Sequence, residues 1–229
     1  MPLALSSVER LAPDWGLFAR EFTSALDPRR FMPPMQPVAP SVGLGRPVLV
    51  IPGFLASDGS TRPLRLALRQ VGFRAHGWKR GRNFGLGANI VDIIDARVRH
   101  IARGSRVSIV GWSLGGLIAR EYAKRAPDQI DKVVTLGSPI CGDLRQNNNV
   151  WRLYEFVAGH PVDAPPVVCA LREKPPVETI AIWSRRDGIV AADSACAFDC
   201  CDRSIEIGCG HMEMVFAPEA IRAVVKALA

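Results

Sequence analysis

One stretch of the sequence, RVSIVGWSLGGLIAREYAKRAP at residues 106–127, constrains the fold more than any other. A short apolar run, typical of a buried strand, leads into Gly111-Trp112-Ser113-Leu114-Gly115, and helical spacing begins at once. Such an abrupt change from strand to helix predicts a strained backbone at Ser113, and glycine on both sides avoids clashes. We therefore expect the Ser113 hydroxyl to stand clear of a sheet at a helix N-terminus, where developing negative charge is favoured. A serine N-cap on a glycine-rich turn is the alternative interpretation.

The remainder of the chain alternates between strand-like and helix-like patterns. Strand-like runs occupy 47–54, 73–78, 106–112, 132–139, 178–188 and 204–211, and helix-like runs occupy 61–72, 88–104, 114–127 and 218–229. Strands and helices that alternate with short connections are typical of βαβ units. The sequence therefore predicts an α/β fold, with a mostly parallel central sheet of about six strands and helices on both faces.

Two segments lie outside this alternation. Residues 1–46 contain one helical pattern followed by FMPPMQPVAP, whose prolines exclude a helix or a central strand. We expect this N-terminal extension to pack on the core of a domain formed by residues 47–229. Residues 141–177 are too long for an ordinary connection, and NVWRLYEFVAGH within them has the spacing of one short amphipathic helix. We expect this insertion to form a cap, or lid, over the site.

Charge and hydropathy exclude several classes of protein. The formal net charge is +7, but the basic residues are scattered and accompany no nucleic-acid-binding motif, so we expect no nucleic-acid partner. This charge remains compatible with weak peripheral contact with a membrane. The apolar runs are far shorter than the roughly 20 residues of a helix that spans a bilayer, so we expect no transmembrane segment. The first residues, MPLALSSVERLAPDW, lack the basic start of a secretory signal, so we expect a cytoplasmic protein.

Four of the six cysteines lie close together in the sequence, at Cys196, Cys200, Cys201 and Cys209. With His211 they could suggest a metal site. However, they form no Cys-x-x-Cys pair, and adjacent cysteines do not match the usual zinc spacings. We expect reduced, packed thiols in a cytoplasmic chain, with no metal and no organic cofactor.

A serine nucleophile needs a base, and the base needs an acid that orients it. His211 follows the last strand-like run directly, which places it at the same sheet edge as Ser113. The other three histidines lie on a weak strand, in a helical pattern and in the insertion: His76, His100 and His160. Asp187 follows the strand-like ETIAIWS and is the predicted acid, with Asp143 as the alternative. The remaining nearby acids, Asp193, Asp199 and Asp202, have the pattern of solvated loop residues.

Backbone N–H groups must also hold the negative oxygen of the reaction intermediate. Leu114, the residue after the predicted nucleophile, supplies one such group, and Phe54, in the turn after the first strand, is expected to supply the other. Apolar side chains near these positions suggest a pocket for an acyl chain or an aromatic group, although ordinary core packing would explain them equally well. The predicted substrate-binding residues are Leu55, Trp112, Trp151, Tyr154 and Phe156.

The pieces VLVIPGF, VSIVGWSLGGLIAREYA, VVTLGSP, WSRRDGIV and GCGHMEM occur in an order that resembles the α/β-hydrolase family, in particular its small bacterial lipase- and esterase-like members. The resemblance covers about residues 47–229. It implies Ser113 as nucleophile, Asp187 as acid, His211 as base, and the amides of Phe54 and Leu114 as the oxyanion hole. It further implies a serine hydrolase that cleaves small carboxylic esters through an acyl-enzyme. A thioesterase or acyltransferase with the same triad, or a non-catalytic binding protein of the same fold, is the alternative.

Overall fold

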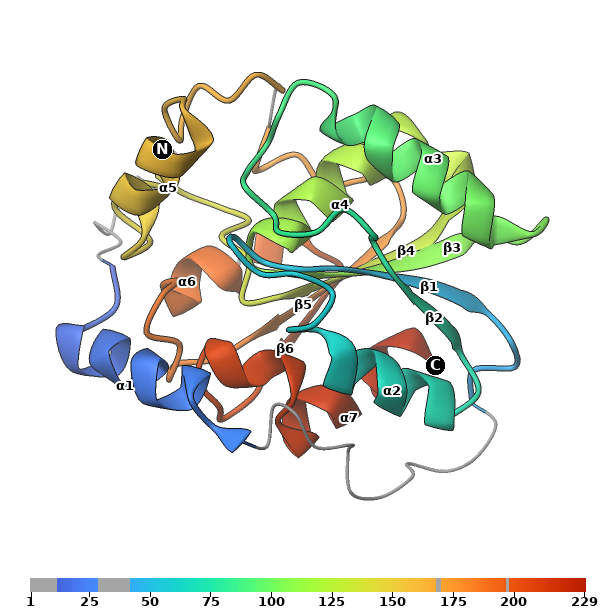
Figure 1. The fold of residues 1–229 in the computed structure, drawn as a ribbon, viewed down its shortest axis with the longest axis horizontal. Helices are drawn as coiled ribbons and strands as arrows, with labels where there is room; N and C mark the ends of the chain where they lie inside the picture. The colour runs from blue at the N-terminus through green and yellow to red at the C-terminus, as the bar shows by residue number, and fades with distance from the viewer. Residues whose placement is uncertain (1–11, 29–41, 168–169, 197) are drawn as a thin grey trace, which may run out of the picture.

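The computed structural model describes residues 12–28, 42–167, 170–196 and 198–229. Its centre is one sheet of six parallel strands in the order β2-β1-β3-β4-β5-β6 (Figure 1). The strands are β1 Pro47–Ile51, β2 Arg74–Gly77, β3 Val107–Trp112, β4 Ile130–Leu136, β5 Glu178–Trp183 and β6 Arg203–Glu206. This architecture confirms the predicted α/β-hydrolase fold. Because every strand runs the same way, all six carboxyl ends lie at one edge of the sheet.

Helices cover both faces of the sheet (Figure 1). They are α1 Trp15–Ala25, α2 Arg62–Gln70, α3 Ile90–Ala102, α4 Leu114–Arg125, α5 Trp151–Ala158, α6 Ala192–Ala195 and α7 Pro218–Leu228. Successive residues of a strand point to opposite faces, and β1 shows the result. Leu49 and Ile51 belong to the apolar cluster that includes α3 and α4, whereas Val48 and Val50 belong to the cluster that includes α2 and α7.

Several strands end earlier than the sequence patterns predict. The run 47–54 stops as a strand at Ile51, before Pro52, which lacks the N–H needed for a sheet hydrogen bond. The run 178–188 stops at Trp183, and 204–211 ends as a strand at Glu206. The chain therefore leaves the sheet several residues before Asp187 and His211, so both side chains are carried by loops beyond its carboxyl edge.

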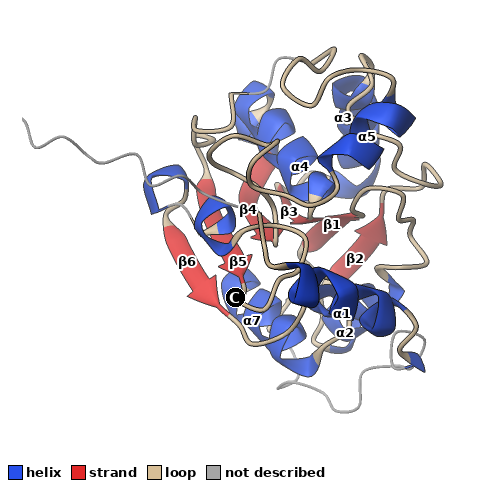
Figure 2. Ribbon diagram, turned by 90° about the vertical axis from the view of Figure 1, so that its left-hand side faces the viewer, coloured by secondary structure: helices blue, strands red, loops and turns tan. Residues whose placement is uncertain are grey.

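Two helices lie next to this edge, one on each side of the sheet (Figures 1 and 2). Helix α5 comes from the insertion 141–177 and lies on the side of α3 and α4. Helix α1 comes from the N-terminal segment, lies on the side of α2 and α7, and contacts the 3-10 turn Met212–Val215. The proline-rich stretch at 31–40 lies outside the described residues.

Among the helices of the described residues, none is both long and apolar enough to cross a bilayer.

Candidate active site

Ser113 occupies a sharp turn between β3 and α4 with a backbone conformation that L-residues rarely adopt. Its φ is 54° and its ψ is −122°, a strain that costs on the order of 1–3 kcal/mol. A Cβ at Gly111 would lie 2.3 Å from the Gly115 carbonyl oxygen, and one at Gly115 would lie 2.3 Å from the Ile51 carbonyl oxygen. Only glycine fits either position. Although Ser113 occupies the N-cap position of α4, its side chain makes no capping hydrogen bond, contrary to the alternative interpretation.

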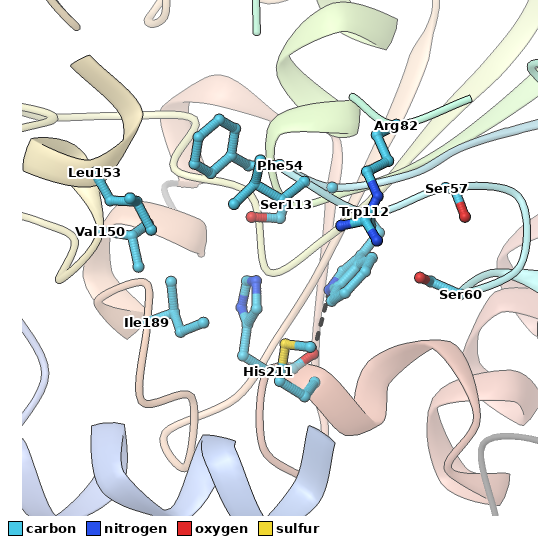
Figure 3. Close-up of a pocket in the computed structure, with 14 residues that line it drawn as sticks. Phe54, Ser57, Ser60, Arg82, Trp112, Ser113, Val150, Leu153, Ile189 and His211 are labelled. Carbon is cyan, nitrogen blue, oxygen red and sulfur yellow. Dashed lines mark hydrogen bonds between the residues drawn. The ribbon is translucent and has the colours of Figure 1, made fainter. Parts of the chain in front are cut away.

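His211 presents its imidazole to the same cavity as Ser113. Figure 3 shows the imidazole pointing toward Ser113. The ring is almost fully buried, and its Nδ1 donates a hydrogen bond to Oδ2 of Asp187 at 2.7 Å. With Nδ1 bound in this way, Nε2 is the ring nitrogen available to accept a proton. Trp112 also holds the backbone of the base, because its Nε1 donates a hydrogen bond to the His211 carbonyl oxygen at 3.2 Å.

Asp187 is held rigidly in the loop after β5. Its Oδ1 accepts hydrogen bonds from the amides of Ile189 and Val190, both at 2.8 Å, which leaves Oδ2 to face His211. The alternative acid, Asp143, lies exposed in a turn, where its carboxylate accepts a hydrogen bond from the Arg145 amide at 2.8 Å. The structure therefore brings Asp187, and not Asp143, to the histidine.

The surroundings of His211 raise the pKa of its imidazole above the ordinary value of 6.5. Burial alone would lower this pKa, because it disfavours the charged ring. The negative charge of Asp187, its hydrogen bond and the charge of Glu21 together outweigh burial. The site thus stabilises an imidazolium, the form that His211 adopts after accepting a proton.

Gly137, which follows β4, makes room for this pair and was not singled out in the sequence. Its φ is 52°, and a Cβ there would lie 2.8 Å from Oδ2 of Asp187 and 3.0 Å from Nδ1 of His211. Any side chain would push the two partners apart. The only signal in the sequence is a glycine directly after a strand, in TLGSP.

The turn after β1 lies against the serine. A Cβ at Gly53 would lie 3.2 Å from the Ser113 Cβ, so the next peptide group, with the Phe54 N–H, borders the site. Leu114 begins α4 on the other side of Ser113. Buried Asn83 holds this turn in place. Its side-chain Nδ2 donates a hydrogen bond to the Pro52 carbonyl oxygen at 2.8 Å, and its backbone carbonyl oxygen accepts one from the Leu55 amide at 2.7 Å. Sequence reasoning missed Asn83, which lies in an unremarkable glycine-rich loop.

Two cavities meet at Ser113. The larger, of about 370 Å³, contains Leu55 and Trp112 among its lining residues, together with Ser57, Ser60 and the basic Arg82 (Figure 3). The smaller, of about 60 Å³, is a narrow apolar pocket. Its lining includes Leu86, Leu114, Leu117, Leu144, Trp151, Tyr154 and Val162.

Helix α5 roofs the narrow pocket. The rings of Tyr154 and Phe54 lie 5.2 Å apart, and the Tyr154 hydroxyl accepts a hydrogen bond from the Leu86 amide at 3.2 Å. Four of the five predicted substrate-binding residues thus line one of the two cavities. Phe156 does not: its side chain is 87% exposed on the outer face of α5. Helical spacing alone could not distinguish this face from the inner one.

Of the four cysteines close to His211 in the sequence, Cys200, Cys201 and Cys209 are buried and Cys196 is half-buried. Within the described part of the chain, no group of three or more histidine, cysteine and acidic side chains is arranged to hold a metal ion. Burial raises the pKa of the Cys200 thiol to about 11 and that of Cys209 to about 12. At neutral pH both therefore remain protonated.

Comparison with known proteins places this geometry in context. The family model described as alpha/beta hydrolase fold matches residues 51–162. That match includes Ser113 and both predicted oxyanion donors but ends before Asp187 and His211. The assignment of the acid and the base therefore depends on the geometry described above.

A pimeloyl-[acyl-carrier protein] methyl ester esterase of Shewanella woodyi is 27% identical over 114 residues, which are 48% of this chain and 42% of that protein. The chain thus matches less than half the length of this relative. Among solved structures, a metagenomic carboxyl esterase has a TM-score of 0.61 at 16% identity, covering 85% of this chain and 77% of its own. A carboxylesterase of Bacillus subtilis has a TM-score of 0.58 at 13% identity, covering 93% and 98%. At these identities, the two structures are evidence for the fold alone.

Proposed function

This chain belongs to the α/β-hydrolase fold family, and we propose that it is a serine hydrolase that cleaves carboxylic esters through an acyl-enzyme. The observation that carries the proposal is the arrangement of three side chains. Ser113 lies on a strained turn in the cavity that His211 lines, and Nδ1 of His211 binds Asp187 at 2.7 Å. Nucleophile, base and orienting acid in this relation form the arrangement that activates a serine.

In the first step, Nε2 of His211 takes the proton from the Ser113 hydroxyl as Oγ forms a bond to the ester carbonyl carbon. The carbonyl π electrons move to oxygen, giving a tetrahedral oxyanion. When this intermediate collapses, the bond to the alcohol oxygen breaks, and the imidazolium returns its proton to the departing alcohol. Asp187 stays ionised throughout and stabilises the imidazolium.

In the second step, His211 removes a proton from water, and the resulting nucleophile attacks the acyl-enzyme carbonyl. Collapse of the second oxyanion releases the carboxylic acid and returns the proton to Ser113. The amides of Phe54 and Leu114 hold the oxyanion in both steps. One such donor contributes about 2.7–4 kcal/mol, or roughly 10²–10³-fold in rate.

The narrow apolar pocket is the proposed site of the acyl group. Its side chains supply no charge, and each CH₂ of an acyl chain that they bury would contribute about 0.8 kcal/mol, roughly fourfold in affinity. The relative from Shewanella woodyi is named as a pimeloyl-[acyl-carrier protein] methyl ester esterase, which supports a carboxylic ester as the substrate class. The wider cavity beside Arg82 would then accommodate the alcohol group.

A p-nitrophenyl ester series of increasing acyl length tests this function, with acyl thioesters of the same lengths beside it. We expect kcat/KM to rise with each added CH₂ until the pocket is full and then to fall, and Ser113→Ala to lose the activity. Faster turnover of the thioesters would assign the same site to a thioesterase. An absence of turnover on both series would contradict a hydrolase and favour a binding protein of this fold.

A further inference from the structure

A buried carboxylate, Glu21, lies behind the candidate triad on helix α1. Glu21 is only 4% exposed, whereas other residues of α1 face solvent: Trp15 is 72% exposed and Phe22 is 63% exposed. Burying a carboxylate is costly unless hydrogen bonds replace its water. Its partners therefore indicate why the residue is there.

Within the described residues, the Glu21 carboxylate accepts three hydrogen bonds, all from backbone amides of the two loops that carry the acid and the base. Oε1 accepts from the amide of His211 at 2.7 Å and from that of Gly188, the residue after Asp187, at 2.9 Å. Oε2 accepts from the amide of Met212 at 2.8 Å. One side chain thus joins the loop after β5 to the loop after β6 directly behind the Asp187–His211 pair.

Glycines in both loops allow this approach. A Cβ at Gly188 would lie 2.3 Å from the Leu17 carbonyl oxygen, and one at Gly210 would lie 3.0 Å from Oε1 of Glu21. A side chain at Gly188 would collide with the backbone of α1, and one at Gly210 would crowd the Glu21 carboxylate. Asn149 also ties the segment before α1 to the same loop, because its Nδ2 donates to the carbonyl oxygens of Pro13 and Gly188 at 3.0 and 2.9 Å.

The charge of Glu21 also faces His211 across these bonds. Asp187 binds the imidazole from the loop after β5, and Glu21, on α1, binds the backbone amide of the same residue. Glu213 lies on the turn that follows His211, where its Oε2 accepts a hydrogen bond from the Gly210 amide at 2.9 Å. The Glu21 carboxylate is thus fixed at the backbone of His211, and its negative charge raises the pKa of the imidazole in addition to the charge of Asp187.

We propose that Glu21 is a positioning residue of the hydrolase: it fixes the backbones of both triad loops and, by its charge, favours the imidazolium form of His211. This proposal rests on the proposed function, since it concerns the base of that reaction. Glu21 lines neither of the two cavities that meet at Ser113, so its effect on turnover passes through His211 and Asp187.

The test compares Glu21→Gln and Glu21→Ala with wild type across pH. Turnover of a p-nitrophenyl ester is normalised to the serine that a fluorophosphonate labels, which removes any misfolded fraction from kcat. We expect Glu21→Ala to lower kcat on the order of 10²-fold, because small misplacements of catalytic groups have effects of this size. The loss should be smaller in Glu21→Gln, whose amide oxygen still accepts hydrogen bonds. KM should change little. In both variants the fall of the rate at acidic pH, the acidic limb of the pH–rate profile, should move to lower pH.

Glu121→Gln is the matched control, because Glu121 is equally buried at 5% but pairs with Lys124 on α4. The same change of charge there should leave the acidic limb in place. A residue that only anchored α1 would lower the melting temperature and the labelled fraction without moving this limb.

NMR titration of the His211 imidazole, assigned with His211→Asn, separates this proposal from the proposed function. It needs no turnover, so a protein that hydrolyses no ester would overturn the function and still report on Glu21. We expect a lower imidazole pKa in Glu21→Gln than in wild type. This variant keeps the size of the side chain and one acceptor oxygen, so it remains usable if Glu21→Ala does not fold. An unchanged titration, or an unchanged kcat in Glu21→Ala, would overturn the proposal.

Discussion

At the scale of single residues, the candidate site concentrates features that are costly elsewhere in a protein. Ser113 has a positive φ, and Asp187 and His211 are ionisable side chains with almost no exposure. Each feature is balanced by a specific contact: glycines surround the turn, and amides or the partner ring bind both oxygens of Asp187. Because each contact involves particular atoms, a substitution that exchanges a single atom or group should change the rate of the reaction without changing the stability of the fold.

Asp187→Asn exchanges one oxygen for an NH₂ group. The remaining oxygen can still accept from the Ile189 and Val190 amides, so we expect the loop to keep its shape. The NH₂ group would face Nδ1 of His211 and favour the wrong tautomer, lowering kcat by up to roughly 10⁴-fold. Asp143→Asn, in an exposed turn, should leave the kinetics of ester hydrolysis unchanged. If Asp143→Asn caused the larger loss, the acid would be misassigned.

The pH dependence of the rate follows from the raised pKa of His211. Only the neutral ring can take the serine proton, so the rate should fall as pH decreases through this pKa. Because the pKa of the folded protein lies above 6.5, the acidic limb of kcat/KM should have its midpoint above 6.5 as well. A profile of nitrophenyl ester hydrolysis measures this midpoint. A midpoint below 6.5 would mean that the charges around His211 do not control its proton.

The residues differ in how far the sequence could predict them. Ser113 is marked by its own neighbours, because strand, tight turn and helix are all local patterns. Asn83, Gly137 and Glu21 carry no such mark, since the need for each arises from a segment distant in the sequence. Glu21 binds amides more than 160 positions away, at Gly188, His211 and Met212. No local pattern encodes such a contact.

At the scale of elements, α5 and its connections determine which space the substrate can occupy. The short helix predicted in the insertion is present, at Trp151–Ala158. Its orientation could not be predicted, because an eight-residue helix with apolar residues on several sides has more than one plausible inner face. In the structure, Trp151 and Tyr154 face the narrow pocket and Phe156 faces outward. We propose that this helix acts as the cap of the acyl pocket.

Trp151→Ala tests the cap through the acyl-length profile on p-nitrophenyl esters. Removing the indole enlarges the narrow pocket, so the optimum should move to longer chains while the rate on short esters is preserved. The lost contacts with the Arg145 and Arg152 guanidinium groups, 5.6 and 5.2 Å from the indole, should cost only about 0.5–1 kcal/mol each.

Phe156→Ala is the control for this experiment, because its exposed ring lines neither cavity. Its profile should match that of wild type. An unchanged optimum in Trp151→Ala, or a uniform loss of activity with a lowered melting temperature, would instead make α5 part of the scaffold.

At the scale of the whole molecule, one parallel sheet explains how residues so far apart in the sequence meet. Ser113, Asp187 and His211 each follow a different strand, and parallel strands all end at the same edge. The alternation of strand and helix patterns was sufficient to predict this sheet, because most of the strands and helices follow one another through short connections, the insertion at 141–177 being the exception. The docking of α1 behind the triad could not be predicted in the same way, since the amino-acid sequence of residues 29–41, between α1 and β1, has neither helical nor strand periodicity.

Labelling with a fluorophosphonate tests the central claim, a serine activated by His211 and Asp187, most directly. The reagent bonds covalently to an activated serine oxygen, and peptide mass spectrometry identifies the labelled residue. We predict one label per wild-type chain, on Ser113, and none on Ser113→Ala, whose fold should persist because the hydroxyl caps nothing. Labelling of Asp187→Asn should be strongly slowed. No label on folded wild-type protein, or a label that persists in Ser113→Ala, would contradict the account.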